Sequence, residues 1–125
     1  MLEEASCPCG SEKSYAQCCG VFHQGGGAST PELLMRSRYT AFVKGNIRYL
    51  QETWHPSTRP PLDLDGNPEW VKLQILESWQ RNTKGYVHFR AFYQEQGVLQ
   101  MMEEKSKFVY ENGCWFYVEP ENLKL

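Results

Sequence analysis

Residues Tyr86–Gln94 read YVHFRAFYQ, and this stretch decides the fold class. Apolar and polar side chains alternate along it, and such a period of two is typical of a β-strand with one buried face. The alternation places four side chains on one face, Val87, Phe89, Ala91 and Tyr93. The sequence therefore predicts a sheet in this part of the chain.

The flanking stretches extend the sheet in both directions. We predict further strands over Trp70–Ser78, over Gly97–Met102 and Lys105–Tyr110 joined as one long strand, and over Cys114–Val118. In the first of these, Val71, Leu73 and Ile75 are expected on one face. Asn112-Gly113 is a hairpin signal, because both residues tolerate the left-handed backbone that a tight turn requires. Strands joined by such turns form an antiparallel meander.

Helical signals precede the strands. Thr30-Pro31-Glu32 is typical of a helix start, and Met35, Tyr39 and Phe42 then recur at helical spacing. Gly45 ends this helix, and the next residue caps a second one over about 47–53. Residues 55–68 contain four prolines and predict a loop or a lid. Helices followed by an antiparallel meander indicate an α+β fold, with the helices packed on one face of a curved sheet.

Length and composition restrict the function classes. The chain has 125 residues, enough for one modest core, and 14% of them are aromatic. Its formal net charge of −2 argues against nucleic-acid binding, which normally needs a concentrated basic face. We expect no membrane segment and no signal peptide, because no apolar run is long enough and the first residues are acidic. The expected location is the cytoplasm.

Four cysteines fall within a short N-terminal stretch, as the pairs Cys7-x-Cys9 and Cys18-Cys19. Two close pairs of thiolates separated by a short turn suit a tetrahedral zinc site, and a complete four-sulfur shell is structural rather than catalytic. Iron also accepts four sulfurs, and disulfides are the non-metal alternative. Residues 1–24 are thus predicted to form a segment that holds one zinc ion. A glycine joint at 25–27 separates it from a second unit over residues 30–125.

Several motifs resemble known families. The run Cys7–Gly20, CPCGSEKSYAQCCG, resembles the SEC-C zinc motif. Three later runs resemble the YchJ family of uncharacterised bacterial proteins: LMRSRYTAF from Leu34, TWHPSTRP from Thr53 and NGCWFYV from Asn112. The resemblance implies an NTF2-like domain, a cone of helices wrapped by a curved sheet, after a zinc-binding segment with the four cysteines as ligands. It implies no activity.

Four residues are candidates for lining a pocket in such a cone: Trp54, His55, Arg59 and Arg90. A histidine beside a pocket could act as a general acid or base, and an arginine could clamp an anion. The alternative for His55 is a histidine that fixes the loop, and for Arg59 a structural or solvated charge. Arg90 shares its strand face with His88, and periodicity does not decide whether that face points into the cone or to solvent.

Other side chains have simpler interpretations. His23 could replace one cysteine as a ligand, but four thiolates already complete the shell. Cys114 is expected to be a packed thiol on the same face as Phe116 and Val118. The adjacent Glu103 and Glu104 point to opposite faces of a strand and are expected on a solvated rim. We expect a basic, solvated surface on the helix that starts near Thr30, formed by Arg36, Arg38 and Lys44.

Two functions remain open on the sequence alone. The first is a protein-binding or adaptor module, in which a structural zinc ion holds a finger that presents Lys13, Tyr15 and Phe22 to a partner. The alternative is a small-molecule binder or an enzyme that uses the pocket of the cone. The SEC-C version in the bacterial preprotein translocase ATPase carries several lysines between its cysteine pairs and binds an acidic chaperone surface. In this chain Lys13 is the only lysine between the two cysteine pairs, which argues against binding of the same chaperone.

Overall fold

The computed structural model describes residues 6–121. The N-terminal segment contains a 3-10 turn, η1 (Tyr15–Gln17), and a short helix, α1 (Cys19–His23). Two helices follow, α2 (Pro31–Lys44) and α3 (Ile47–Glu52). Four strands complete the chain: β1 (Glu69–Arg81), β2 (Lys84–Glu95), β3 (Val98–Glu111) and β4 (Cys114–Pro120). The ends of the two predicted units, residues 1–5 and 122–125, lie outside the described residues.

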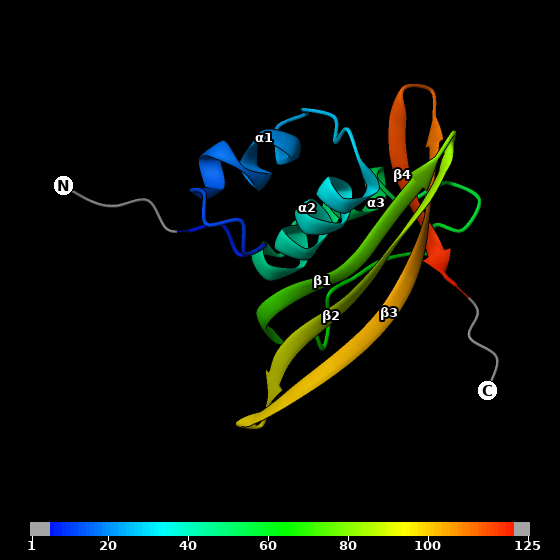
Figure 1. Cartoon of the computed structure of the whole chain (residues 1–125). Helices are drawn as coiled ribbons and strands as arrows, with labels where there is room; N and C mark the ends of the chain where they lie inside the picture. Colours follow the sequence, from blue (N-terminus) through cyan, green and yellow to red (C-terminus); the bar gives the residue numbers. More distant parts are fainter. Residues whose placement is uncertain (1–5, 122–125) are drawn as a thin grey trace.

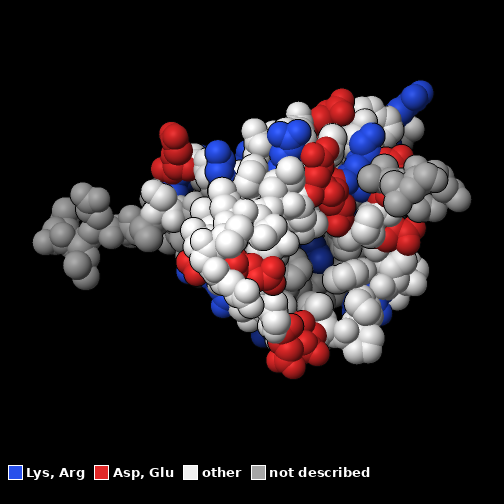
Figure 2. All heavy atoms as spheres, turned by 90° about the horizontal axis from the view of Figure 1, so that it is seen from below, with Lys and Arg blue, Asp and Glu red and all other residues white. Residues whose placement is uncertain are grey.

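The four strands form one antiparallel meander in the order β1-β2-β3-β4. The predicted α+β architecture is therefore confirmed, including the single long strand β3. Figure 1 shows α2 and α3 against one side of the curved sheet, with the N-terminal segment beyond α2. Seen from below, the surface is hollowed, and a Lys or Arg side chain is visible inside the hollow (Figure 2). No helix within residues 6–121 combines the length and the apolar character that crossing a bilayer requires.

Local sequence signals set the helix ends. The Thr30 hydroxyl accepts a hydrogen bond from the Leu33 N–H at 3.1 Å, and Pro31 occupies the first helical position. Gly45 ends α2 with a φ of 73°, in the left-handed region where a glycine is unstrained. The Asn46 side chain then accepts from the Tyr49 N–H at 3.1 Å and starts α3. These contacts satisfy backbone groups that a helix end leaves unpaired.

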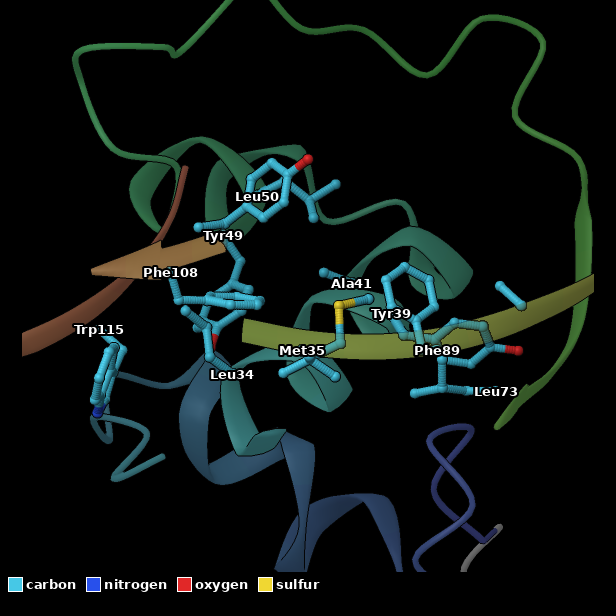
Figure 3. Packing of buried hydrophobic residues seen from close by; sticks show 13 residues of the cluster. Leu34, Met35, Tyr39, Ala41, Tyr49, Leu50, Leu73, Phe89, Phe108 and Trp115 are labelled. Atoms are coloured by element: carbon cyan, nitrogen blue, oxygen red, sulfur yellow. The ribbon is translucent and has the colours of Figure 1, made fainter. Parts of the chain in front are cut away.

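One apolar core lies between the helices and the sheet (Figure 3). Its buried members come from α2, α3 and all four strands: Leu34, Met35, Tyr39, Ala41, Tyr49, Leu50, Leu73, Val87, Phe89, Ala91, Phe108, Trp115 and Tyr117. The predicted inward face of β2 is buried at Val87, Phe89 and Ala91. The helical stripe on α2 is confirmed as well, with Phe42 half-buried against the same cluster.

Leu73 and Ile75 face the core of the protein as predicted, but the predicted placements of Val71 in β1 and of Cys114 in β4 are wrong. The pairing of β1 with β2 shifts between Trp70 and Lys72, so Val71 has no paired residue on β2. Its side chain is 49% exposed, and the neighbouring Trp70 packs against Tyr39 instead. Such a bulge interrupts the period of two.

In β4, Trp115 and Tyr117 face the core, and the first residue of the strand, Cys114, is exposed. The expectation of a packed thiol at Cys114 therefore fails. The alternation in this strand is real, but the two large aromatic side chains take the inner face.

Candidate functional site

The four N-terminal cysteines converge on one point. The sulfur atoms of Cys7, Cys9, Cys18 and Cys19 all lie within 4.8 Å of one another. Three of these residues are buried, Cys18 is half-buried, and the Sγ atoms of Cys9 and Cys18 are 3.6 Å apart. All five cysteines of the chain are free thiols. Residues 6–24 therefore fold around a cluster of four sulfurs.

The cluster has the dimensions of a tetrahedral metal site. Zinc–thiolate bonds of about 2.3 Å imply sulfur–sulfur edges of roughly 3.8 Å, close to the separation of Cys9 and Cys18. The backbone turns sharply within the first pair, where the Gly10 N–H donates to the Cys7 carbonyl at 3.2 Å and Gly10 has a φ of 88°. The four residues fit a divalent ion, and a four-sulfur shell leaves it no position for water.

Electrostatics gives a second reason for a cation at this place. A hydrogen bond from the Cys19 thiol lowers the pKa of Cys9 to about 4. The same bond, together with burial, raises the pKa of Cys19, and burial raises the pKa of Cys18. One thiolate thus suppresses ionisation of its neighbours. A divalent cation would remove this repulsion and allow all four sulfurs to be thiolates.

The sulfur cluster is fixed to the body of the protein through α2. Arg36 donates from Nη1 to the Cys9 carbonyl oxygen at 2.7 Å. The Cys7 sulfur lies 3.7 Å from the Thr40 hydroxyl, which is fully buried. The glycine joint at 25–27 therefore connects two parts that are in direct contact.

His23 also serves this attachment and is not a metal ligand. One ring nitrogen, Nε2, is 2.8 Å from the Ser37 carbonyl oxygen, and the other, Nδ1, is 2.7 Å from the Tyr15 hydroxyl. A carbonyl only accepts, so Nε2 carries the proton and Nδ1 accepts from the tyrosine. Burial lowers the pKa of His23 and favours this neutral form.

A cavity of about 180 Å³ lies between α2 and the sheet. Most of its wall is apolar, from Met35, Phe42, Trp70, Phe89 and Met102, but Arg38 and Glu104 also reach it.

The four predicted pocket residues are not brought together. Trp54 lines the cavity, and Arg59 donates to the Trp54 carbonyl at 3.1 Å outside it. Arg90 lies on the opposite face of β2, where it pairs with Glu103 at 3.0 Å. Glu103 also bonds His88 at 2.7 Å, so this face of the sheet is a charged outer surface.

His55 lies on the surface near the end of β3. Its Nε2 is 3.1 Å from a Glu111 carboxylate oxygen, and its Nδ1 accepts from the Ser57 backbone N–H at 3.1 Å. These contacts hold the proline-rich loop against the β3–β4 hairpin, together with a bond from the His55 N–H to the Tyr117 carbonyl. The arrangement matches the expectation of a histidine that fixes the loop.

Sequence reasoning missed the two charged residues of the cavity. Arg38 is only 3% exposed, so its assignment to a solvated helix surface is wrong. Its position gave a signal, because it lies three residues after Met35 and four before Phe42, within the apolar stripe of α2. Glu103 and Glu104 do point to opposite faces as expected, but Glu104 points into the cavity and not to a solvated rim.

Comparison with known families agrees with this architecture. The family described as "YchJ, middle NTF2-like domain" matches residues 30–120, and the SEC-C motif matches residues 5–20. The chain belongs to the YchJ family. The two matches fall on either side of the glycine joint, and the SEC-C match contains all four clustered cysteines.

Relatives in the YchJ family share nearly the whole chain. A UPF0225 protein of Streptomyces coelicolor is 47% identical over 122 residues, which cover 94% of this chain and 95% of the relative. A UPF0225 protein of Vibrio parahaemolyticus is 38% identical over 123 residues, 92% of this chain and 74% of the relative.

Two solved structures share the fold. The solution structure of a SEC-C motif containing protein from Rhodopseudomonas palustris has a TM-score of 0.86 and 34% identity, covering 96% of this chain and all of that one. The crystal structure of a SEC-C motif containing protein from Psychrobacter arcticus has a TM-score of 0.76 and 25% identity, covering 96% and 84%.

Proposed function

We propose that the four clustered cysteines bind one zinc ion as a structural centre, and that the segment built around it is a protein-binding module of an adaptor protein. The observation that carries the proposal is the closed cluster of four sulfurs. A metal held by four thiolates has no vacancy for a substrate, so its contribution is to the shape of the segment.

The segment has little else to hold it together. Its own buried cluster consists of Cys7, Cys9 and Cys19, with Tyr15 and Cys18 packed against it. Structural zinc sites supply the folding free energy of such small segments, on the order of 10–16 kcal/mol in isolated finger peptides. Zinc is proposed over iron because it is redox-inert and commonly takes a tetrahedral set of four cysteines.

The surface offered to a partner differs from the sequence-based hypothesis. Tyr15 is turned inward, where its hydroxyl bonds His23 and its ring lies under the Lys44 ammonium at 4.2 Å. Phe22 packs against the core of the body. Lys13 alone of the three residues in that hypothesis is exposed. The exposed side chains of the segment are Ser6, Glu12, Lys13, Ala16, Gln17, Val21 and Gln24. Val21 is 48% exposed and is the large apolar side chain of this candidate surface.

Metal content can be tested directly. Native mass spectrometry of reduced, freshly purified protein is expected to show one zinc ion per chain, and a Cys9→Ser variant is expected to lose it. Cys114→Ser is the matched control, because this exposed thiol is outside the cluster. Protein that carries no metal, or whose clustered cysteines are oxidised to each other, contradicts the proposal.

A test of partner binding needs a variant that changes the candidate surface and keeps the fold. Val21→Asp is expected to abolish capture of a specific protein partner, with zinc content unchanged. Val71→Asp is the matched control, since Val71 is equally exposed, at 49%, but lies on β1. Capture that survives both Val21→Asp and removal of the zinc excludes the segment as the binding surface.

A further inference from the structure

The cavity of the cone contains a buried positive charge with incomplete pairing. Arg38 donates from Nη1 to the Leu50 carbonyl oxygen at 2.8 Å and to the Thr53 hydroxyl at 2.6 Å. Both acceptors are neutral. The guanidinium also lies 5.2 Å from the Trp54 ring centroid and 4.6 Å from that of Tyr117. Burial lowers the pKa of Arg38 to about 10, so it remains charged at neutral pH.

The remaining donors of Arg38 face open space. Its Nε and Nη2 atoms make no hydrogen bond within residues 6–121. The Ser14 hydroxyl is the only fully enclosed side-chain polar atom without a partner in that range, so neither of these nitrogens is fully enclosed, and Arg38 is one of the residues that line the cavity. A planar guanidinium with two free donors is the geometry that grips a carboxylate.

A carboxylate reaches the same cavity without neutralising the arginine directly. Glu104 Oε2 accepts hydrogen bonds from the Ser106 hydroxyl and from the Tyr117 hydroxyl, the latter at 3.2 Å. Its other oxygen, Oε1, has no hydrogen-bond donor among the described residues. No salt bridge within 4.0 Å joins Arg38 to Glu104. The cavity therefore presents a cationic group, Arg38, and an anionic group, Glu104, each with hydrogen-bonding atoms that have no partner, within largely apolar walls.

We propose that this cavity binds a small, partly apolar carboxylic acid that also carries an amine or hydroxyl group. The carboxylate accepts from the free donors of Arg38, the amine or hydroxyl donates to Glu104, and the hydrocarbon part packs against Met35, Phe42 and Met102. The volume of about 180 Å³ equals roughly six water molecules at ~30 Å³ each, which suits a compound of metabolite size. This inference goes beyond the proposed adaptor function and does not depend on the zinc site.

The pairing of opposite charges explains why such a ligand would bind. A buried charge without a partner is costly, and a ligand that pairs with both Arg38 and Glu104 recovers this energy within largely apolar walls. A ligand that supplies only the carboxylate places a second negative charge near Glu104. A ligand that supplies only the amine leaves Arg38 without an anionic partner. Each missing charge-assisted bond is expected to weaken binding about tenfold or more.

The test uses the whole protein and four probes of matched size. Leucine and 2-hydroxy-4-methylpentanoate carry both groups, 4-methylpentanoate lacks the donor, and leucinamide lacks the carboxylate. Titration calorimetry, together with NMR shifts of the Trp54 and Trp70 indole N–H groups, is expected to show saturable binding of the first two probes. The other two are expected to bind about tenfold more weakly or not at all.

A charge-neutral variant makes the prediction sharper. Glu104→Gln keeps the shape of the side chain, and it is expected to weaken leucine binding while improving binding of 4-methylpentanoate. Glu103→Gln is the matched control, because this neighbour points to the outer face of the sheet. Circular dichroism verifies that both variants fold.

Three results would overturn the assignment. The first is no saturable binding of leucine or the hydroxy acid at about 10 mM, above the range of weak millimolar affinity. The second is leucinamide binding as tightly as leucine. The third is an unchanged probe preference in a folded Glu104→Gln variant. None of these outcomes bears on zinc content or on the Val21 surface, so the two proposals fail separately.

Discussion

The N-terminal segment, residues 6–24, and the body, residues 30–121, are stabilised by different physical means. The body encloses an apolar core drawn from two helices and four strands. The segment encloses mainly sulfur atoms. Apolar burial needs no cofactor, whereas four clustered thiols repel one another as they ionise, a repulsion that a bound cation would remove. The comparison teaches that one short chain can combine a part built on an apolar core with a part built on a sulfur cluster that could hold a metal.

Metal removal is expected to produce the largest difference between the two regions. A chelator, or Cys9→Ser, should unfold the segment, because the proposed zinc site would supply most of its stability, on the order of 10 kcal/mol. The body should remain folded. Residue-resolved amide hydrogen exchange measures this directly, with Cys114→Ser as the control. Protection that persists in residues 6–24 without metal would remove the distinction between the two regions.

Truncation of a core side chain should destabilise the body, which metal removal leaves folded. Phe108 is 1% exposed at the centre of the core, and Phe108→Ala is expected to cost about 3–5 kcal/mol of the free energy of unfolding. Met101→Ala, at a 47% exposed position on the same strand, should cost far less. Chemical denaturation followed by tryptophan fluorescence compares them. Equal losses for the two variants would argue against the described core.

The contact between the two regions should have an intermediate energy. Arg36→Gln removes the hydrogen bond to the Cys9 carbonyl and is expected to weaken docking of the segment by about 1.5–3 kcal/mol. Arg48→Gln is a matched control: Arg48 pairs with Glu52 four residues away, as Arg36 pairs with Glu32, but it is exposed and makes no contact with the cysteines. Hydrogen exchange in the segment should increase only for Arg36→Gln. An identical response of both variants would mean that docking does not depend on this bond.

Acidification should loosen the same contact by a smaller amount. Burial lowers the pKa of His23 below its usual 6.5, so the unfolded chain binds more protons between these two values. Its contribution to stability is therefore complete above pH 6.5 and is lost as the pH falls through the lowered pKa. Thermal melts between pH 7.5 and 5.5 measure the effect.

The His23→Gln variant keeps all four cysteines and serves as the control for metal loss. Its melting temperature should depend less on pH than that of the wild type. If both proteins lose stability equally on acidification, His23 is not the responsible group.

The parts of the fold that depend on local interactions were predictable. The Thr30 and Asn46 caps, the left-handed Gly45 and the alternation of β2 each involve residues a few positions apart, and the structure has all of them. The spacing of the cysteine pairs likewise predicted a cluster, because each pair is brought together by one turn.

The cavity was not predictable in the same way. Arg38 and Glu104 are far apart in sequence, and although the position of Arg38 in the apolar stripe of α2 indicates burial, nothing local connects it with Glu104. They reach one cavity only because α2 packs across the concave side of the sheet. The exposure of Val71 also follows from packing, since an extra residue in a strand reverses the faces of the side chains on its two sides. Cys114 is exposed because Trp115 and Tyr117 take the inner face of β4.

The sequence by itself determined the elements, their order and the sulfur cluster, because caps, periods and short turns act over a few neighbouring residues. Only the tertiary structure decided which charges are buried, where the segment docks and what the cavity presents. These properties depend on contacts between residues separated by many positions, and the packing of helices on the sheet establishes them.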